Sequence, residues 1–201
     1  MRLRNVCTAL ILGCGTLACL APAALAQMGA AHAKVAVGSP MPPARAQEEL
    51  LNLFEHEFMG VARAMPADKY GFAPSAATFQ PEQGAKFAGV RTFAQQISHV
   101  TEANYYFAST ILGEKPPVDT GSIERLTTKP ELLKAAADSF AYAHKALASI
   151  TAQNAYTTIE GADGLHTRAV LASFIAAHGF DHYGQMVEYL RMNGLVPPGS
   201  K

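Results

Sequence analysis

Four stretches of the chain place apolar residues at alternating steps of three and four, the repeat of an α-helix with one apolar face. We expect helices over about 45–64, 86–112, 130–150 and 165–193. The clearest seam, in the second stretch, consists of Val90, Phe93, Ile97, Val100, Phe107 and Ile111, with Asn104 as a polar interruption. No stretch shows the strict alternation of a half-buried strand. The pattern predicts an all-α, antiparallel-type four-helix bundle, and it leaves open whether one connection is a long crossover.

Helix-ending and helix-capping residues lie at the borders of these stretches. Pro66 ends the first, and Gly113 stands where the second should end. Thr128-Lys129-Pro130-Glu131 is typical of a capping box with proline in the first turn, so it predicts the start of the third helix. Gly194 takes the position of a glycine cap after the fourth.

The first 26 residues have the pattern of a signal peptide. Arg2 and Arg4 precede an almost wholly apolar run, and a small-x-small cleavage motif ends at Ala26. An uncleaved anchor is one alternative, and lipidation at Cys14 or Cys19 is another. The signal predicts an exported protein, either periplasmic or secreted.

The composition beyond the signal excludes several classes of function. The chain has 16 basic and 16 acidic residues, which provide no basic face for a nucleic acid. All three cysteines lie within the signal, so the rest of the chain has no thiol for a cysteine nucleophile, a redox pair or a zinc finger. No later stretch resembles a membrane span, so none is expected after cleavage. Residues 27–44 read as a flexible leader, and 45–201 as the folded domain.

The fourth helix carries two histidines on its inward stripe. His178 and His182 are four residues apart, so they lie one above the other and can converge on a single ion. A buried imidazole pair without such a partner would leave polar atoms unsatisfied. A third ligand has to come from elsewhere, and the candidates are His56, His99, His144 and His166. Helical spacing does not choose among them, and His99 itself sits two positions off the seam of its helix.

Two stretches of the sequence resemble the DinB-like superfamily. One is Ile97-Ser98-His99-Val100 with Asn104-Tyr105-Tyr106, which is similar to the helix that carries that family's first histidine. The other runs from His178-Gly179-Phe180-Asp181-His182 to Pro197-Pro198 and is similar to the family's C-terminal signature. The resemblance implies a four-helix bundle, often dimeric, in which His99, His178 and His182 hold a divalent metal. Gly179 departs from the small polar residue that many relatives have.

A site of three neutral imidazoles would leave the ion its full charge and an open coordination position. We expect zinc, with nickel or iron as alternatives, and such an ion polarises a bound water or activates a thiolate. Glu102, one turn beyond His99, is a candidate proton acceptor. Asp181, Tyr183 and Gln185 are candidates for orienting the imidazoles or binding a ligand.

Three hypotheses about function follow from these observations. Some members of the resembled family are thiol-dependent transferases or isomerases, so the first hypothesis is a metal-dependent transferase or hydrolase with an unknown small-molecule substrate. The second is a metal- or small-molecule-binding envelope protein without turnover, in which a protein group blocks the open position. The third is a structural or dimerisation module with vestigial histidines. A homodimer is a further expectation.

Overall fold

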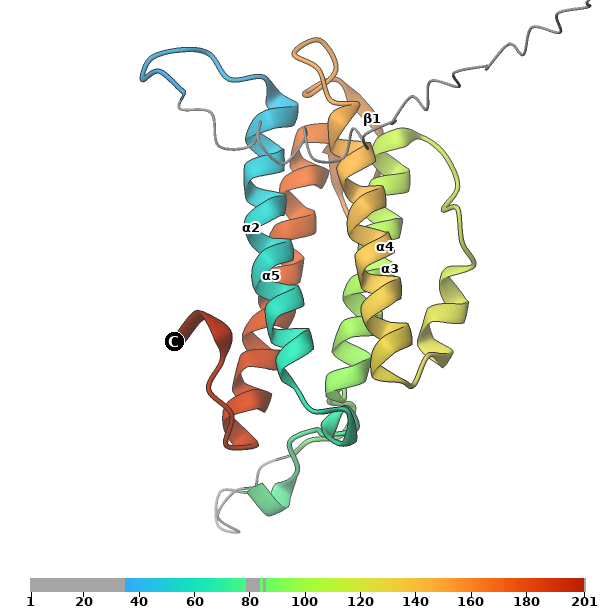
Figure 1. Cartoon of the computed structure of the whole chain (residues 1–201). Helices are drawn as coiled ribbons and strands as arrows, with labels where there is room; N and C mark the ends of the chain where they lie inside the picture. The colour runs from blue at the N-terminus through green and yellow to red at the C-terminus, as the bar shows by residue number, and fades with distance from the viewer. Residues whose placement is uncertain (1–34, 79–83, 85, 201) are drawn as a thin grey trace, which may run out of the picture. The chain divides into compact units, whose positions relative to one another are not determined.

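The computed structural model describes residues 35–78, 84 and 86–200, and the expected signal peptide lies outside them. Residues Pro40–Lys201 form one compact unit. In the described part of this unit, four α-helices pack into a bundle (Figure 1): α2 (Pro43–Ala64), α3 (Phe93–Leu112), α4 (Lys129–Ala148) and α5 (Arg168–Met192). The prediction of an all-α four-helix bundle is confirmed.

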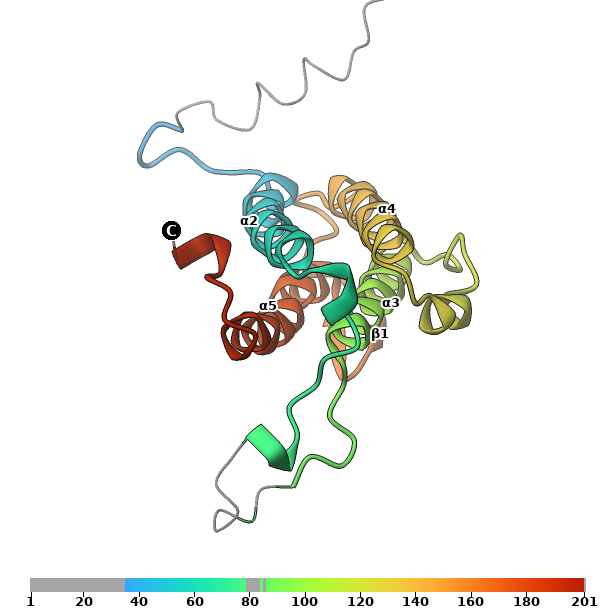
Figure 2. The same ribbon diagram turned by 60° about the horizontal axis from the view of Figure 1, so that its bottom comes forward.

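The order of the helices around the bundle is α2, α4, α3, α5, because α2 and α3 each pack against both α4 and α5 (Figure 2). The α4 helix starts at the end of α2, where the Lys129 ammonium donates to the carbonyls of Arg63 and Met65. The α3 helix starts at the same end, where the Phe93 N–H donates to the Phe72 carbonyl. Helices α3 and α4 therefore run in the same direction, opposite to α2 and α5. The segment between them, which includes the short helix η5 (Thr120–Arg125), is the long crossover that periodicity left open.

The α3 helix begins at Phe93, later than the expected start near residue 86. Thr92 sets this start through a capping box: its hydroxyl accepts from the Gln95 N–H at 3.2 Å, and its own N–H donates to the Gln95 side-chain oxygen at 2.9 Å. Val90 precedes the cap and is 37% exposed, so its place in the predicted seam is wrong. The rest of that seam, from Phe93 to Ile111, is buried.

A short two-stranded antiparallel sheet, which the apolar pattern of the sequence did not indicate, precedes α5. Strand β1 (Thr158–Ala162) pairs with β2 (Leu165–Thr167), with an irregular register between them. Asp163 and Gly164 join them with φ values of 51° and 79°, as the tight turn of a hairpin requires. The α5 helix therefore begins at Arg168 rather than near residue 165, and Thr167 caps it by accepting from the Val170 N–H.

Aromatic side chains fill the core between α2, α4 and α5. Phe54 and Phe140 are fully buried, with ring centroids 5.3 Å apart. Gly179 of α5 lies against Phe54, and a Cβ at this position would come within 1.9 Å of the Phe54 ring. Glycine here allows α5 to approach α2 closely, and this packing accounts for the departure from the pattern of the resembled family.

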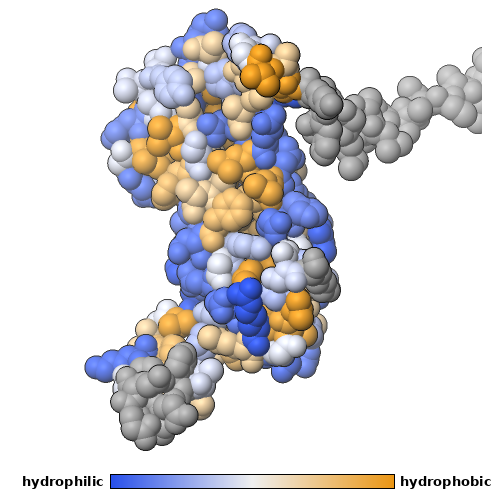
Figure 3. Space-filling view, turned by 90° about the vertical axis from the view of Figure 1, so that its left-hand side faces the viewer, coloured by the Kyte–Doolittle hydropathy of each residue, from blue (hydrophilic) through white to orange (hydrophobic). Residues whose placement is uncertain are grey.

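The outer surface of the bundle mixes polar and apolar side chains. Leu50 and Leu53 of α2 are 36% and 54% exposed. Figure 3 shows apolar residues gathered between polar ones on the side of the bundle where α2 and α5 lie. None of the helices in the described part of the chain has the length and apolar character needed to cross a membrane.

Candidate metal centre

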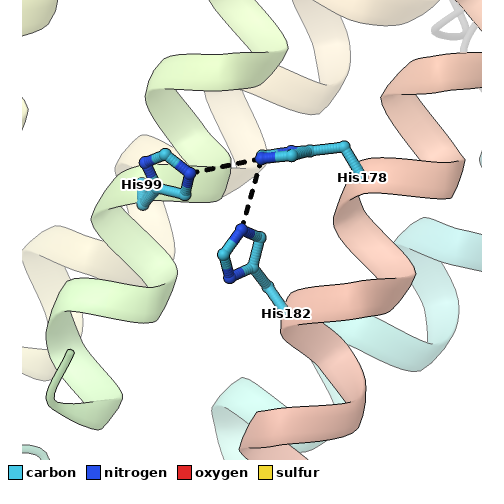
Figure 4. A group of neighbouring side chains, drawn as sticks. All are labelled: His99, His178 and His182. Carbon is cyan, nitrogen blue, oxygen red and sulfur yellow. Dashed lines mark hydrogen bonds between the residues drawn. The ribbon is translucent and has the colours of Figure 1, made fainter. Parts of the chain in front are cut away.

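Three histidines meet between α3 and α5. His99 comes from α3, and His178 and His182 come from successive turns of α5, with their rings directed toward one another (Figure 4). The Nε2 atom of His178 lies 3.2 Å from Nε2 of His99 and 3.2 Å from Nε2 of His182. Among the described residues, this is the one group of three or more histidine, cysteine or acidic side chains with ligand atoms within 4.8 Å of one another. We call it the histidine triad.

The donor atoms of the histidine triad suit a divalent cation. A ring nitrogen of a neutral imidazole either donates or accepts one hydrogen bond, so His178 Nε2 can satisfy only one of its two 3.2 Å contacts. A cation among the three nitrogens would use all three lone pairs. Tetrahedral zinc, with Zn–N bonds of about 2.0–2.1 Å, spaces its ligand nitrogens about 3.3 Å apart, close to the spacings found here.

A chain of hydrogen bonds places the proton of His182 away from the centre. The Asp181 carboxylate can only accept, so it takes the Gln185 amide N–H at 3.3 Å. The Gln185 oxygen then accepts from the Gln96 amide at 2.8 Å, and the Gln96 oxygen accepts from His182 Nδ1–H at 2.7 Å. With its proton on Nδ1, His182 keeps the Nε2 lone pair directed toward the other two rings, as metal ligation requires.

The histidine triad is uncharged at neutral pH even without a metal. Burial, followed by the charges of Arg91 and His178, lowers the pKa of His99 to about 4. Burial and the two neighbouring imidazoles lower the pKa of His182 to about 4 as well. Burial also lowers the pKa of His178. Neutral imidazole is the form that binds a metal, so little proton competition is expected at pH 7.

Two clefts reach the histidine triad. The polar cleft, of about 420 Å³, is lined by charged side chains that include Arg91, Glu102 and Glu124. The apolar cleft, of about 340 Å³, is lined by the aromatic rings of Tyr106, Phe107 and Phe174 together with His178, Thr120 and Asp163. His99 and Glu102 line both clefts, so the border between them lies at the candidate metal centre.

Glu102 is placed to exchange protons beside the centre. Its Oε1 atom is buried and has no hydrogen-bond partner among the described residues. Burial raises the pKa of this carboxyl, the Glu124 charge raises it further, and Arg91 partly offsets the rise. A carboxyl group with a raised pKa is a more effective proton acceptor near neutral pH.

The other polar residues that the sequence analysis proposed for the site differ in how they relate to the histidine triad. Asp181 and Gln185 act on the histidine triad through Gln96. Tyr183 instead donates to Glu57 of α2 at 2.9 Å, outside the group. Among the alternative third ligands, none joins His178 and His182: His56 and His166 are exposed, and His144 pairs with two glutamates of α2.

Two residues of the site were not recognised from the sequence. Gln96 is 1% exposed and lies one turn before His99, where its side chain contacts His182 of α5. Arg91 precedes α3, and its guanidinium lies 3.4 Å from His99 Nδ1. A polar residue one turn from a predicted ligand is the signal that could have identified Gln96. Arg91 lies before the start of α3, so helical spacing does not predict its place at the site.

The fold and the site define a class of protein, a four-helix bundle with a histidine triad suited to a divalent metal. A family model described as the DinB superfamily matches residues 50–186. The chain therefore belongs to the DinB superfamily, and the family predicted from the sequence is confirmed. A comparison with curated proteins finds no match to this sequence.

Proposed function

We propose that the protein is an exported metal-dependent transferase or hydrolase that acts on a small molecule, with the ion held by His99, His178 and His182. The observation that carries this proposal is the meeting of three neutral imidazole nitrogens at the border of two clefts. Zinc is the expected ion, with nickel or iron as alternatives. When bound, such an ion supplies a positive charge that polarises a carbonyl, a thiol or a water beside it.

The residues around the histidine triad have separate tasks in this proposal. Glu102 accepts a proton from the attacking group, since its buried oxygen is without a partner among the described residues and its pKa is raised. Gln96 holds the proton of His182 on Nδ1. Arg91 contributes a positive charge to the lining of the polar cleft, beside His99.

The test combines metal analysis with a screen of ester hydrolysis and thiol transfer, using protein reconstituted separately with zinc, nickel and iron. His178→Ala should lose both metal and activity. Glu102→Gln should keep the metal and lose about a hundredfold or more in rate. His56→Ala, which changes an exposed histidine of α2, is the matched control and should change neither.

Each outcome of this screen has a distinct meaning. A wild-type protein that binds no metal overturns the proposal. Metal binding without turnover on any substrate supports the alternative of an envelope protein that only binds. Full activity in Glu102→Gln removes the proton-accepting role from that residue. Export is tested separately by N-terminal sequencing of the mature protein, which should begin after Ala26.

A further inference from the structure

The two clefts at the histidine triad differ in chemistry, and this difference bears on the kind of molecule that the site takes. Arg91 and Glu124 line the polar cleft alone, so an apolar group placed there would strip water from these two charged side chains. The exposed lining of the apolar cleft is mainly apolar and includes three aromatic rings, although Glu102, Thr120 and Asp163 also line it. An apolar group seated against the aromatic rings would displace water at little cost. A ligand at the centre therefore has one preferred orientation.

Two of the aromatic rings that line the apolar cleft pack against His178, a predicted metal ligand. The Phe107 and Phe174 rings pack edge to face, with centroids 5.2 Å apart. Each of these rings also lies 6.0 Å from the imidazole of His178. Tyr106 is 47% exposed, so its ring remains free to contact a ligand. A group seated against this wall is within reach of the centre.

We propose that the apolar cleft is a specificity site for a flat aromatic or branched apolar substituent, carried by a small molecule whose polar group binds at the metal. This inference rests on the proposed metal site. A volume of about 340 Å³ is ample for a benzene ring and falls at the lower end of the range for small-molecule pockets. The polar end of the molecule is directed toward Glu102 and Arg91.

The test uses two hydroxamates as probes, because both chelate a metal through the same group and differ only in their substituent. Isothermal titration calorimetry on the zinc-loaded full chain should find benzohydroxamate bound about tenfold or more tighter than acetohydroxamate, since the phenyl ring buries the larger apolar area. Tyr106→Ala and Phe174→Ala should reduce this ratio to about threefold or less while zinc stoichiometry stays unchanged. Tyr156→Ala, which removes a 76% exposed ring that does not line the cleft, should keep the ratio.

The outcomes distinguish the failure of this inference from the failure of the proposed metal site on which it rests. A protein that binds none of zinc, nickel and iron overturns both. Zinc binding with equal affinity for the two hydroxamates overturns the inference alone. A preference for benzohydroxamate that survives both Tyr106→Ala and Phe174→Ala also overturns it, because the ring would then be seated elsewhere. Tyr106→Ala keeps the test decisive even if Phe174→Ala disturbs the fold, since Tyr106 is on the surface.

Discussion

Two clusters of side chains in the same bundle contain histidine, one made of three histidines and the other of one histidine and two glutamates. They hold imidazole in opposite charge states. Between α3 and α5, burial lowers the pKa of His99 and His182 to about 4, so the rings are neutral. Between α4 and α2, His144 donates from both ring nitrogens to Glu48 at 2.6 Å and Glu55 at 2.9 Å. These bonds raise the pKa of His144 to about 9 against the opposing effect of burial, so this ring is charged.

The difference lies in what each imidazole faces. His144 has two carboxylates as partners and forms a complete ion cluster that needs no ligand. His178 faces two other imidazoles, which cannot all satisfy one another. Only the second arrangement calls for an external cation. A pair of carboxylates therefore converts a potential metal ligand into a structural ion pair.

The largest expected effect that separates the two clusters is stabilisation by zinc. At a free zinc concentration 1,000 times its Kd, the free energy of unfolding should rise by about 4 kcal/mol. The rise should disappear in His99→Ala and persist in His144→Ala. Chemical denaturation of metal-stripped protein with and without zinc measures it. Loss of the zinc effect in His144→Ala would contradict the claim that only the histidine triad binds the cation.

Substitution of Gln96 should weaken the metal site without removing a ligand. Gln96→Leu removes the acceptor of the His182 Nδ1–H, and loss of such a partner weakens metal binding by about 10- to 100-fold. Competition with a chromogenic chelator measures the zinc affinity. Gln153→Leu, at an exposed position outside both clusters, is the control. An unchanged affinity in Gln96→Leu would mean that the hydrogen-bond chain does not support the site.

The pH dependence of stability should reveal the charged cluster. Because the pKa of His144 is about 9 when folded and near 6.5 when unfolded, its contribution is complete below pH 6.5 and disappears as the pH rises through 9. The loss should be on the order of 3 kcal/mol, measured by denaturation at a series of pH values. His144→Gln should lack this part of the pH dependence, and an identical profile in that variant would contradict the assignment.

The smallest expected effect distinguishes the two carboxylates that hold His144. The hydrogen bond that Glu48 accepts from His144 is the largest cause of the raised pKa, and the one that Glu55 accepts is the second. NMR titration of the His144 ring should therefore show the pKa fall further in Glu48→Gln than in Glu55→Gln. The reverse order would assign the stronger bond to Glu55.

The sequence predicted the helices because their apolar periodicity is a local property. The residues of the predicted seam from Ile97 to Ile111 are all buried, and even Asn104 is accommodated by donating to Ser139. The hairpin before α5 was missed although Asp163-Gly164 is a recognisable turn signal, because its strands are too short to show alternation. The start of α3 was misplaced because Val90 continues the spacing beyond the Thr92 cap.

The site was less accessible to sequence reasoning because it depends on which helices are neighbours. Periodicity placed His99 on a flank of its helix, and it is half-buried there at the border between α3 and α5. Only the family resemblance identified it as the partner of His178 and His182. Gln96 and Arg91 escaped notice because their partners are distant in the sequence or outside the helical repeat.

The most direct test of the account is elemental analysis of the protein purified from its natural compartment, in parallel with His178→Ala. The account predicts about one divalent metal ion per chain in the wild type and none in the variant, with both proteins folded by circular dichroism. A folded wild-type chain without metal, or a variant that retains one ion per chain, would contradict it.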